Sequence, residues 1–229
     1  MLGNWNRGVQ LASAEYVTFC HDDDVLLPNC LSRLLTLQKQ NGCKCILSKY
    51  NIIDENGVIV MPYNYPHKLI GVMKEKDHYS YSLYNQFVMS MGFGVGCLFN
   101  RACMLSLGGY NNTFYPSADY ALQASYTYYY GCVINNVPTF NYRVATNESS
   151  NIWDKFADAD LIIRNSIIEE LHGPKWLLRR IMQANDRLSR ISFATKWGGV
   201  SNIILRQKKM SDRIIMKLAL MPNRLKRYC

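Results

Sequence analysis

The amino-acid sequence predicts an α/β fold, because short apolar segments alternate with helical patterns along its first 151 residues. The chain has 229 residues, 48 % hydrophobic and 19 % charged, so it can build a core as one large domain or one domain with an appendage. No stretch approaches the 18 apolar residues of a transmembrane helix, and the N-terminus lacks the apolar run of a signal peptide. We therefore expect a folded, cytoplasmic protein.

Turn residues and apolar spacing divide the first half of the chain into elements. Pro28 suits the first turn of a helix, Asn41-Gly42 ends that helix, and Asp54-Glu55-Asn56-Gly57 is a strong hairpin turn. The expected elements are a helix ending near residue 13, strand 16–20, helix 28–41, strand 46–53, short strand 58–60 and loop 61–78.

The alternation continues to residue 151, and the pattern beyond it is helical. Gly108-Gly109 and Gly131 are stop signals for helices. The expected elements are a strand within 92–101, short helix 102–107, helix 119–130 and extended pieces at 133–134 and 140–144. Breaks in the helical part are expected at Gly173-Pro174, Gly198-Gly199 and Pro222.

The positive charge of the chain lies in its C-terminal part. Residues 1–170 carry 12 Lys/Arg and 15 Asp/Glu, whereas residues 171–229 carry 14 Lys/Arg and two Asp. Within this tail, residues 203–228 interleave eight Lys/Arg with apolar residues, a pattern typical of a helix on an anionic membrane. Nucleic acid is the rival partner, and packing of the apolar face on the body is the plain structural alternative.

Eight cysteines are scattered along the chain without a Cys-x-x-Cys or a zinc-ligand spacing. We expect buried, reduced thiols that behave as small apolar side chains.

Three adjacent carboxylates, Asp22-Asp23-Asp24, follow the apolar strand 16–20. Their mutual repulsion costs stability unless a cation or hydrogen bonds compensate it. Mg²⁺ and Mn²⁺ take such oxygen ligands, and sites in α/β sheets lie beyond the carboxyl ends of strands. A solvated acidic turn before the helix at Pro28 is the alternative.

The acidic run stands within a longer pattern that resembles glycosyltransferase family 2. In that family an Asn-x-Gly helix leads into an apolar strand, a DxD-type motif and a proline. The matching segments are Asn6-Arg7-Gly8, Ala14-Glu15-Tyr16-Val17, 19–28, 94–101, Gly108-Gly109-Tyr110, 117–122 and 137–143. The resemblance implies a partial glycosyltransferase A fold (Rossmann-like, with a mixed sheet) over residues 1–151, followed by a helical basic extension over 152–229.

The resemblance also implies site residues. Asp23 matches the ligand of a divalent cation, Mn²⁺ or Mg²⁺, that bridges two phosphates, and Asp24 is a further metal position, either as ligand or in the surrounding shell. Asp22 matches the carboxylate that contacts the nucleotide ribose or the water shell of the metal. Asp119 matches the catalytic base of inverting members, with a helix N-cap as the alternative. Arg143 is expected to neutralise phosphate charge, with a surface ion pair as the alternative.

The implied activity is transfer of a glycosyl group from a nucleotide sugar to a saccharide or lipid-linked saccharide, in cell-surface polysaccharide synthesis of the O-antigen or capsule type. Because such enzymes touch the inner membrane face, we expect peripheral contact with that anionic face rather than binding of nucleic acid. The alternatives are a nucleotidyltransferase, an inactive remnant, and a basic membrane- or nucleic-acid-binding protein without catalysis.

The sequence also departs from the family pattern. His21 stands where many members have the first Asp of the acidic motif, so a metal ligand can be lost, although other members carry His there. Ala118 replaces a frequent Glu, and Ala145 replaces a frequent His. Met1 falls inside the helix before the acidic motif, so we expect an N-terminal truncation or a missing part supplied by another chain.

Overall fold

A computed structural model describes residues 2–62, 72–73, 94–144, 152–170 and 174–197. The chain divides into two compact units. Of the described residues, 2–62, 72–73, 94–113 and 118–144 belong to the first unit, and 114–117, 152–170 and 174–197 belong to the second.

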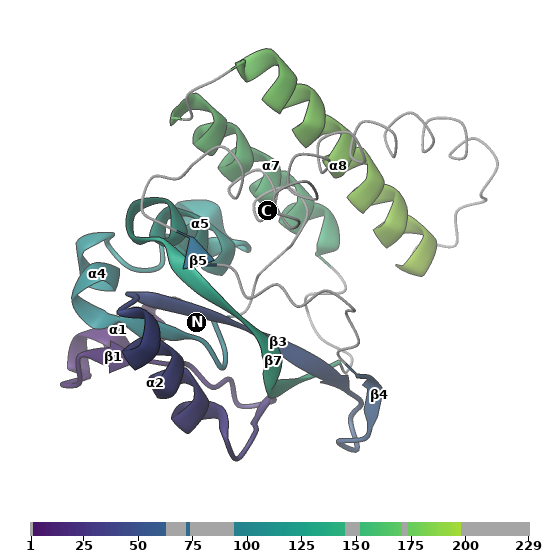
Figure 1. The fold of residues 1–229 in the computed structure, drawn as a ribbon. Helices are drawn as coiled ribbons and strands as arrows, with labels where there is room; N and C mark the ends of the chain where they lie inside the picture. Colours follow the sequence, from purple (N-terminus) through teal and green to yellow (C-terminus); the bar gives the residue numbers. More distant parts are fainter. Residues whose placement is uncertain (1, 63–71, 74–93, 145–151, 171–173, 198–229) are drawn as a thin grey trace, which may run out of the picture. The chain divides into compact units, whose positions relative to one another are not determined.

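The first unit is built on a mixed sheet (Figure 1). Its strands are β1 (Tyr16–Val17), β2 (Val25–Leu26), β3 (Cys45–Ile53), β4 (Ile59–Met61), β5 (Val72–Met73), β6 (Leu98–Asn100) and β7 (Cys132–Arg143). The strand order is β1-β6-β3-β7-β2, with β4 added to β3 and β5 to β7. The long strands β3 and β7 are parallel, and the other pairs of named strands in the described part of the chain are antiparallel. The expected α/β class with a mixed sheet is confirmed.

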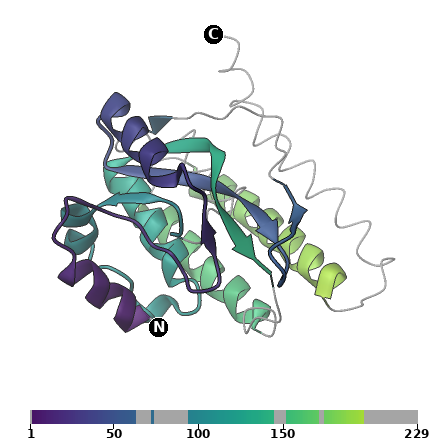
Figure 2. The ribbon, with the colours of Figure 1, turned by 90° about the horizontal axis from the view of Figure 1, so that it is seen from below.

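Helices cover both faces of this sheet (Figures 1 and 2). Because successive side chains of a strand point to opposite faces, each strand can contribute to both layers. On one face, Leu34 of α2 (Cys30–Asn41) packs with Ile46 and Leu98. On the other face, Tyr126 of α5 (Ala118–Tyr130) packs edge-on against Phe99 with ring centroids 5.4 Å apart. The neighbouring β6 residues Leu98 and Phe99 therefore pack on opposite faces of the sheet.

Tyr126 anchors α5 by a polar contact as well as by burial. Its side chain is fully buried, and its hydroxyl lies 3.0 Å from the carbonyl oxygens of both Lys44 and Asn100. Burial raises the pKa of Tyr126, so the hydroxyl stays a neutral donor.

Arg101 fixes the first helix of the chain, α1 (Leu2–Leu11), against α4 (Arg101–Ser106). The Nε and Nη2 atoms of Arg101 donate hydrogen bonds of 2.8 Å to the carbonyls of Val9 and Gln10. These carbonyls lie in the last turn of α1 and have no partner within the helix. The guanidinium therefore caps α1 and sets its position.

The second unit contains α7 (Trp153–Glu170) and α8 (Lys175–Trp197), which pack on each other. Their buried apolar residues are Ala159, Ile163, Ile168, Leu178, Ile181, Met182 and Ala184. Glu169, near the end of α7, pairs with Lys175 and Arg179 of α8. Among the described helices, none is long and apolar enough to cross a membrane.

The structure differs from the sequence prediction in four elements. Strand 16–20 is shortened to β1, and β2 follows the acidic run, where no strand was expected. The expected loop 61–78 contains β5, and β7 is one strand rather than two extended pieces. Pro138 reads as a strand breaker in sequence, but β7 stays paired with β3 through register shifts at this point.

The cysteine prediction is confirmed only in part, and the predictions for the end of the chain lie outside the described residues. Cys30, Cys45, Cys97 and Cys132 are buried as expected, but Cys20 is exposed because it lies in the loop before the acidic run. The breaks at Gly198-Gly199 and Pro222 and the amphipathic segment 203–228 lie outside the described residues.

Candidate functional site

The acidic residues lie in the loop between β1 and β2. These two strands stand at opposite ends of the strand order, so the loop crosses the sheet. The Gly96 N–H donates to the Phe19 carbonyl at 3.2 Å, and the Leu27 N–H donates to the Thr139 carbonyl at 2.9 Å. Main-chain bonds at both ends thus hold the loop in place.

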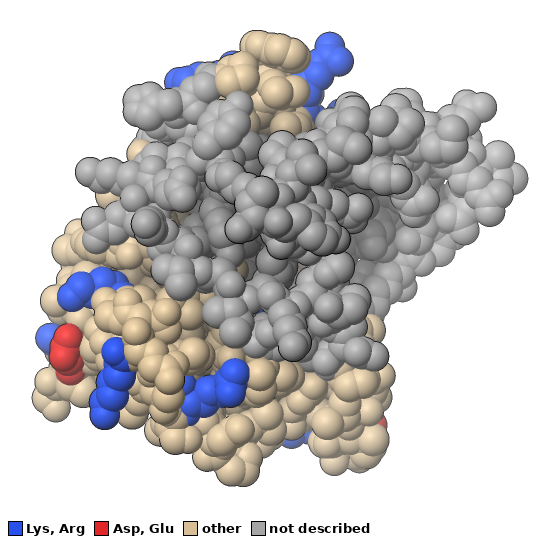
Figure 3. Space-filling view, viewed as in Figure 1, with Lys and Arg blue, Asp and Glu red and all other residues tan. Residues whose placement is uncertain are grey.

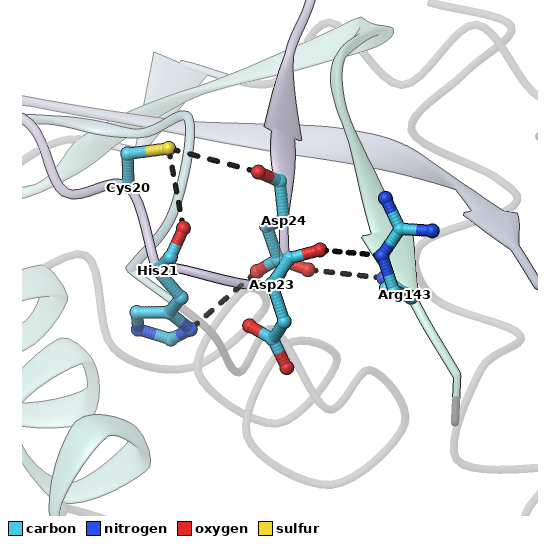
Figure 4. Close-up of polar contacts among 5 residues, drawn as sticks. All are labelled: Cys20, His21, Asp23, Asp24 and Arg143. Carbon is cyan, nitrogen blue, oxygen red and sulfur yellow. Dashed lines mark hydrogen bonds and ion pairs between the residues drawn. The ribbon is translucent and has the colours of Figure 1, made fainter. Parts of the chain in front are cut away.

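Three side chains of this loop converge (Figure 4). One ligand atom from each of His21, Asp23 and Asp24 lies within 4.8 Å of the other two. The structure therefore brings together the two predicted metal residues and adds His21, whose replacement of an aspartate suggested a lost ligand. Asp22 is exposed and does not belong to this trio.

Asp24 is the buried member of the trio, with 7 % of its surface exposed. Its Oδ1 accepts a hydrogen bond of 3.0 Å from the Arg143 main-chain N–H. Its Oδ2 is buried and has no hydrogen-bond donor among the described residues; His21 Nδ1 lies 3.4 Å away. A buried carboxylate oxygen without a donor is costly, and a cation held with the imidazole and the Asp23 carboxylate would satisfy it. The donor set therefore fits a divalent metal.

Arg143 connects the acidic loop to the turn between β3 and β4. Its Nε donates to the Asp23 carbonyl at 2.8 Å, and its Nη1 donates to the carbonyls of Asp54 and Glu55 at 2.8 and 2.9 Å. Together with the main-chain bond to Asp24, these contacts hold three segments at one point (Figure 4). Phosphate binding by Arg143 stays a prediction.

An aromatic group supports the trio from the side of α1. The Trp5 ring is stacked on the His21 ring, with centroids 5.0 Å apart and planes 5° apart. Trp5 also meets Tyr110 edge-on at 4.9 Å, and Phe19 contacts Tyr110 at 5.5 Å. These contacts restrict the orientation of the imidazole.

Asp119 is the second residue of α5, so it lies inside the first helical turn rather than at the N-cap. Burial and, secondly, the negative charge of Asp119 raise the pKa of Tyr110. Asp119 is therefore near Tyr110, which contacts Trp5. The predicted base is not a member of the metal trio, and Tyr110 lies near both Asp119 and the Trp5 ring that stacks on His21.

Sequence reasoning missed the supporting roles of Trp5, Tyr110 and Asn6. The Asn6 amide donates to the Tyr110 carbonyl and accepts from the Tyr110 N–H, both at 2.8 Å. Asn6 was noted only as part of the Asn-x-Gly pattern. Its partner is 104 residues away, so local spacing could not identify it.

Comparisons with known proteins agree with the fold of this chain. Residues 1–104 match the family model described as glycosyl transferase family 2. The fold is similar to the crystal structure of S. aureus TarS 1-349 (TM-score 0.52, 13 % identity, 93 % of this chain covered). It is also similar to the same protein in complex with UDP-GlcNAc (TM-score 0.54, 11 % identity, 90 % covered). The chain spans 58 % of the length of each of these structures. No curated protein matches the sequence significantly.

Proposed function

We propose that the protein transfers a sugar from a nucleotide sugar to a hydroxyl acceptor, because residues 1–104 match the family model of glycosyl transferase family 2 and the fold is similar to that of TarS. The single observation that carries the proposal is the loop trio His21, Asp23 and Asp24, with its buried carboxylate oxygen that lacks a donor. A cation held at such a site can neutralise the charge of a diphosphate leaving group.

The donor is a nucleoside diphosphate sugar, and a UDP-sugar is the first candidate because TarS was crystallised with UDP-GlcNAc. Asp23 and Asp24 would hold a divalent cation, Mn²⁺ or Mg²⁺, which when bound neutralises charge on the diphosphate. Asp22 is exposed next to the trio and is our candidate to accept hydrogen bonds from the ribose hydroxyls or from metal-bound water. Arg143 holds the loop and is our candidate for a contact to phosphate.

Asp119 is the proposed general base of an inverting transfer. Its carboxylate takes the proton of the acceptor hydroxyl as that oxygen bonds to the anomeric carbon. The bond from this carbon to the nucleoside diphosphate breaks on the opposite face, so the configuration inverts. The position of Asp119 in the first turn of a helix with a buried face supports this role, because the helix fixes the carboxylate.

The acceptor is a saccharide or lipid-linked saccharide of cell-surface polysaccharide synthesis, of the O-antigen or capsule type, reached at the cytoplasmic face of the inner membrane. The start of α8 supports contact with an anionic surface. Trp176 is 66 % exposed there, and Arg179 and Arg180 are exposed beside it. Figure 3 shows basic side chains flanking an uncharged patch at the top of the view, where α8 begins.

Incubation of the full chain with a panel of nucleotide sugars and MnCl₂ tests the proposed reaction. We expect release of nucleoside diphosphate in the presence of an acceptor; release of pyrophosphate would instead indicate nucleotidyl transfer. Asp119→Asn should lower the rate at least about a hundredfold, since general-base catalysis contributes that much. The control is Glu55→Gln, an exposed carboxylate on the β3–β4 turn, which should leave the rate unchanged. Full activity of Asp119→Asn would exclude its role as base.

A further inference from the structure

We propose that His21 is itself a ligand of the divalent cation, and that its imidazole makes the site prefer Mn²⁺ over Mg²⁺. This inference rests on the proposed function, because it concerns the cation of the same site. It also reverses the expectation that replacing an aspartate with His21 removes a ligand.

The first support is the position of the imidazole relative to Asp24. Among the described residues, Asp24 Oδ2 has no hydrogen-bond donor, and the Nδ1 atom of His21 lies 3.4 Å from it. The other oxygen of Asp24 is already occupied by the Arg143 N–H. This bond restrains the Asp24 carboxylate, and one ligand atom from each of His21, Asp23 and Asp24 lies within 4.8 Å of the other two.

The second support is the fixed orientation of the ring. Trp5 is stacked on His21 almost in parallel, and α1, which carries Trp5, is capped by Arg101. A ring held in this way loses little rotational freedom when Nδ1 binds a metal. An exposed histidine of an ordinary surface turn has no such platform.

The donor set determines which cation is favoured. Mg²⁺ is a hard ion that takes oxygen ligands and keeps several waters. Imidazole suits transition metals, while carboxylates suit both Mn²⁺ and Mg²⁺. Two carboxylates with one imidazole therefore favour Mn²⁺, whereas an aspartate in place of His21 would bring Mg²⁺ closer in affinity.

The test measures metal binding directly and needs no turnover. MnCl₂ and MgCl₂ are titrated into the full chain, alone and with UDP, and bound Mn²⁺ is measured by electron paramagnetic resonance. Pulsed measurements on the Mn²⁺-loaded protein then report whether a nitrogen is coordinated. The variants are His21→Asp and His21→Asn, with Glu55→Gln as the control that changes an exposed charge outside the trio. Circular dichroism verifies that each variant is folded.

We expect nitrogen coupling in the wild type and in Glu55→Gln, and none in either His21 variant. His21→Asn should weaken Mn²⁺ binding by roughly tenfold or more, and His21→Asp should reduce the ratio of Mn²⁺ to Mg²⁺ affinity by a similar factor. Equal affinities of the wild type for both ions, unchanged coupling in the variants, or no binding in either condition would overturn the proposal. The last two results would leave His21 as a mere ion-pair partner of Asp24. Sugar transfer is assayed separately, and nucleoside diphosphate release with either ion or without added metal would sustain the proposed function in all three cases, so the two proposals fail separately.

Discussion

Asp24 is costly to bury, and the cation proposed for this site would offset that cost. It is 7 % exposed, and only one of its two carboxylate oxygens accepts a hydrogen bond from the described residues. Burial of an ionised group without full pairing opposes folding, and a bound cation removes that cost. The residue therefore links stability to metal binding.

This link predicts the behaviour of Asp24→Asn. The amide oxygen can still accept the Arg143 N–H, and the buried negative charge is removed, so stability without metal should be unchanged or higher by about 1 kcal/mol. The increase in melting temperature that MnCl₂ causes in the wild type should disappear. Thermal unfolding with and without MnCl₂ measures both effects. A variant that still responds to MnCl₂ as the wild type does would contradict the role of Asp24.

Lys49 gives a second prediction at the residue scale. Lys49 lies in β3 with 8 % of its surface exposed, and burial lowers its pKa from 10.5 to about 8. Between these values the unfolded chain binds more protons than the folded chain, so the Lys49 contribution to stability rises with pH. Below pH 8 the full cost of burying the charge remains.

Comparison with Lys49→Met isolates this contribution. The free energy of unfolding of the wild type relative to the variant should increase by up to about 3 kcal/mol from pH 7 to above pH 10. Urea unfolding at both pH values measures this difference, in which the titration of other groups cancels. A difference that stays constant with pH would show that burial does not lower the pKa of Lys49.

At the scale of elements, the segment that follows α4 is held to α1 by Asn6. Gly109 has a φ of +70°, and a Cβ atom there would lie 2.4 Å from Asn6 Oδ1. Gly108 has a similar φ of +81°, but a Cβ atom there would meet nothing within 4 Å. An added Cβ atom would therefore meet Asn6 at Gly109 and open space at Gly108.

Gly109→Ala should consequently be more destabilising than Gly108→Ala. In both variants the strain of a positive φ lowers the free energy of unfolding by about 1 kcal/mol. Only Gly109→Ala also displaces the Asn6 hydrogen bonds to Tyr110, which lowers it by about 1–3 kcal/mol more. Chemical denaturation of the two variants measures the difference. Equal losses would mean that the Asn6 contact contributes nothing to stability.

Arg143 joins three elements, and this predicts a phenotype different from that of a simple phosphate ligand. Arg143→Met removes three hydrogen bonds to the carbonyls of Asp23, Asp54 and Glu55. We expect a loss of about 1–3 kcal/mol in stability and weaker Mn²⁺ binding without nucleotide, because the loop is no longer held. If Arg143 acted only on phosphate, Mn²⁺ binding without nucleotide would be unchanged and only UDP binding would fall.

At the scale of the whole molecule, the charge is divided between a nearly neutral body and a basic tail. Binding of the full chain to vesicles with anionic lipids should fall as NaCl is raised, since each Lys or Arg near the surface contributes about 1 kcal/mol that salt screens. The double variant Trp176→Ser/Arg180→Gln should bind more weakly, and Lys39→Gln on exposed α2 is the charge-matched control. Vesicle sedimentation measures both. Equal binding to neutral and anionic vesicles would contradict the electrostatic contribution.

The sequence by itself determined what depends on local patterns. Helical spacing with stop signals at Gly42 and Gly131 predicted α2 and α5, and apolar β-branched residues predicted β3. The run Asp22-Asp23-Asp24 after an apolar strand predicted a cation site, because repulsion between adjacent carboxylates needs compensation. Each of these features is encoded within about a dozen neighbouring residues.

Only the tertiary structure decided which side chains meet. Trp5 stacks on His21, Asn6 pairs with Tyr110, and Arg143 reaches the carbonyls of Asp23 and Asp54, across separations of 16 to 120 residues. The continuity of β7 through Pro138 likewise depends on its pairing with β3. Such contacts form only where the sheet brings distant segments together, so no local pattern records them. The proposed role of His21 depends on such contacts, because the fold places the Trp5 ring and the buried Asp24 oxygen next to it.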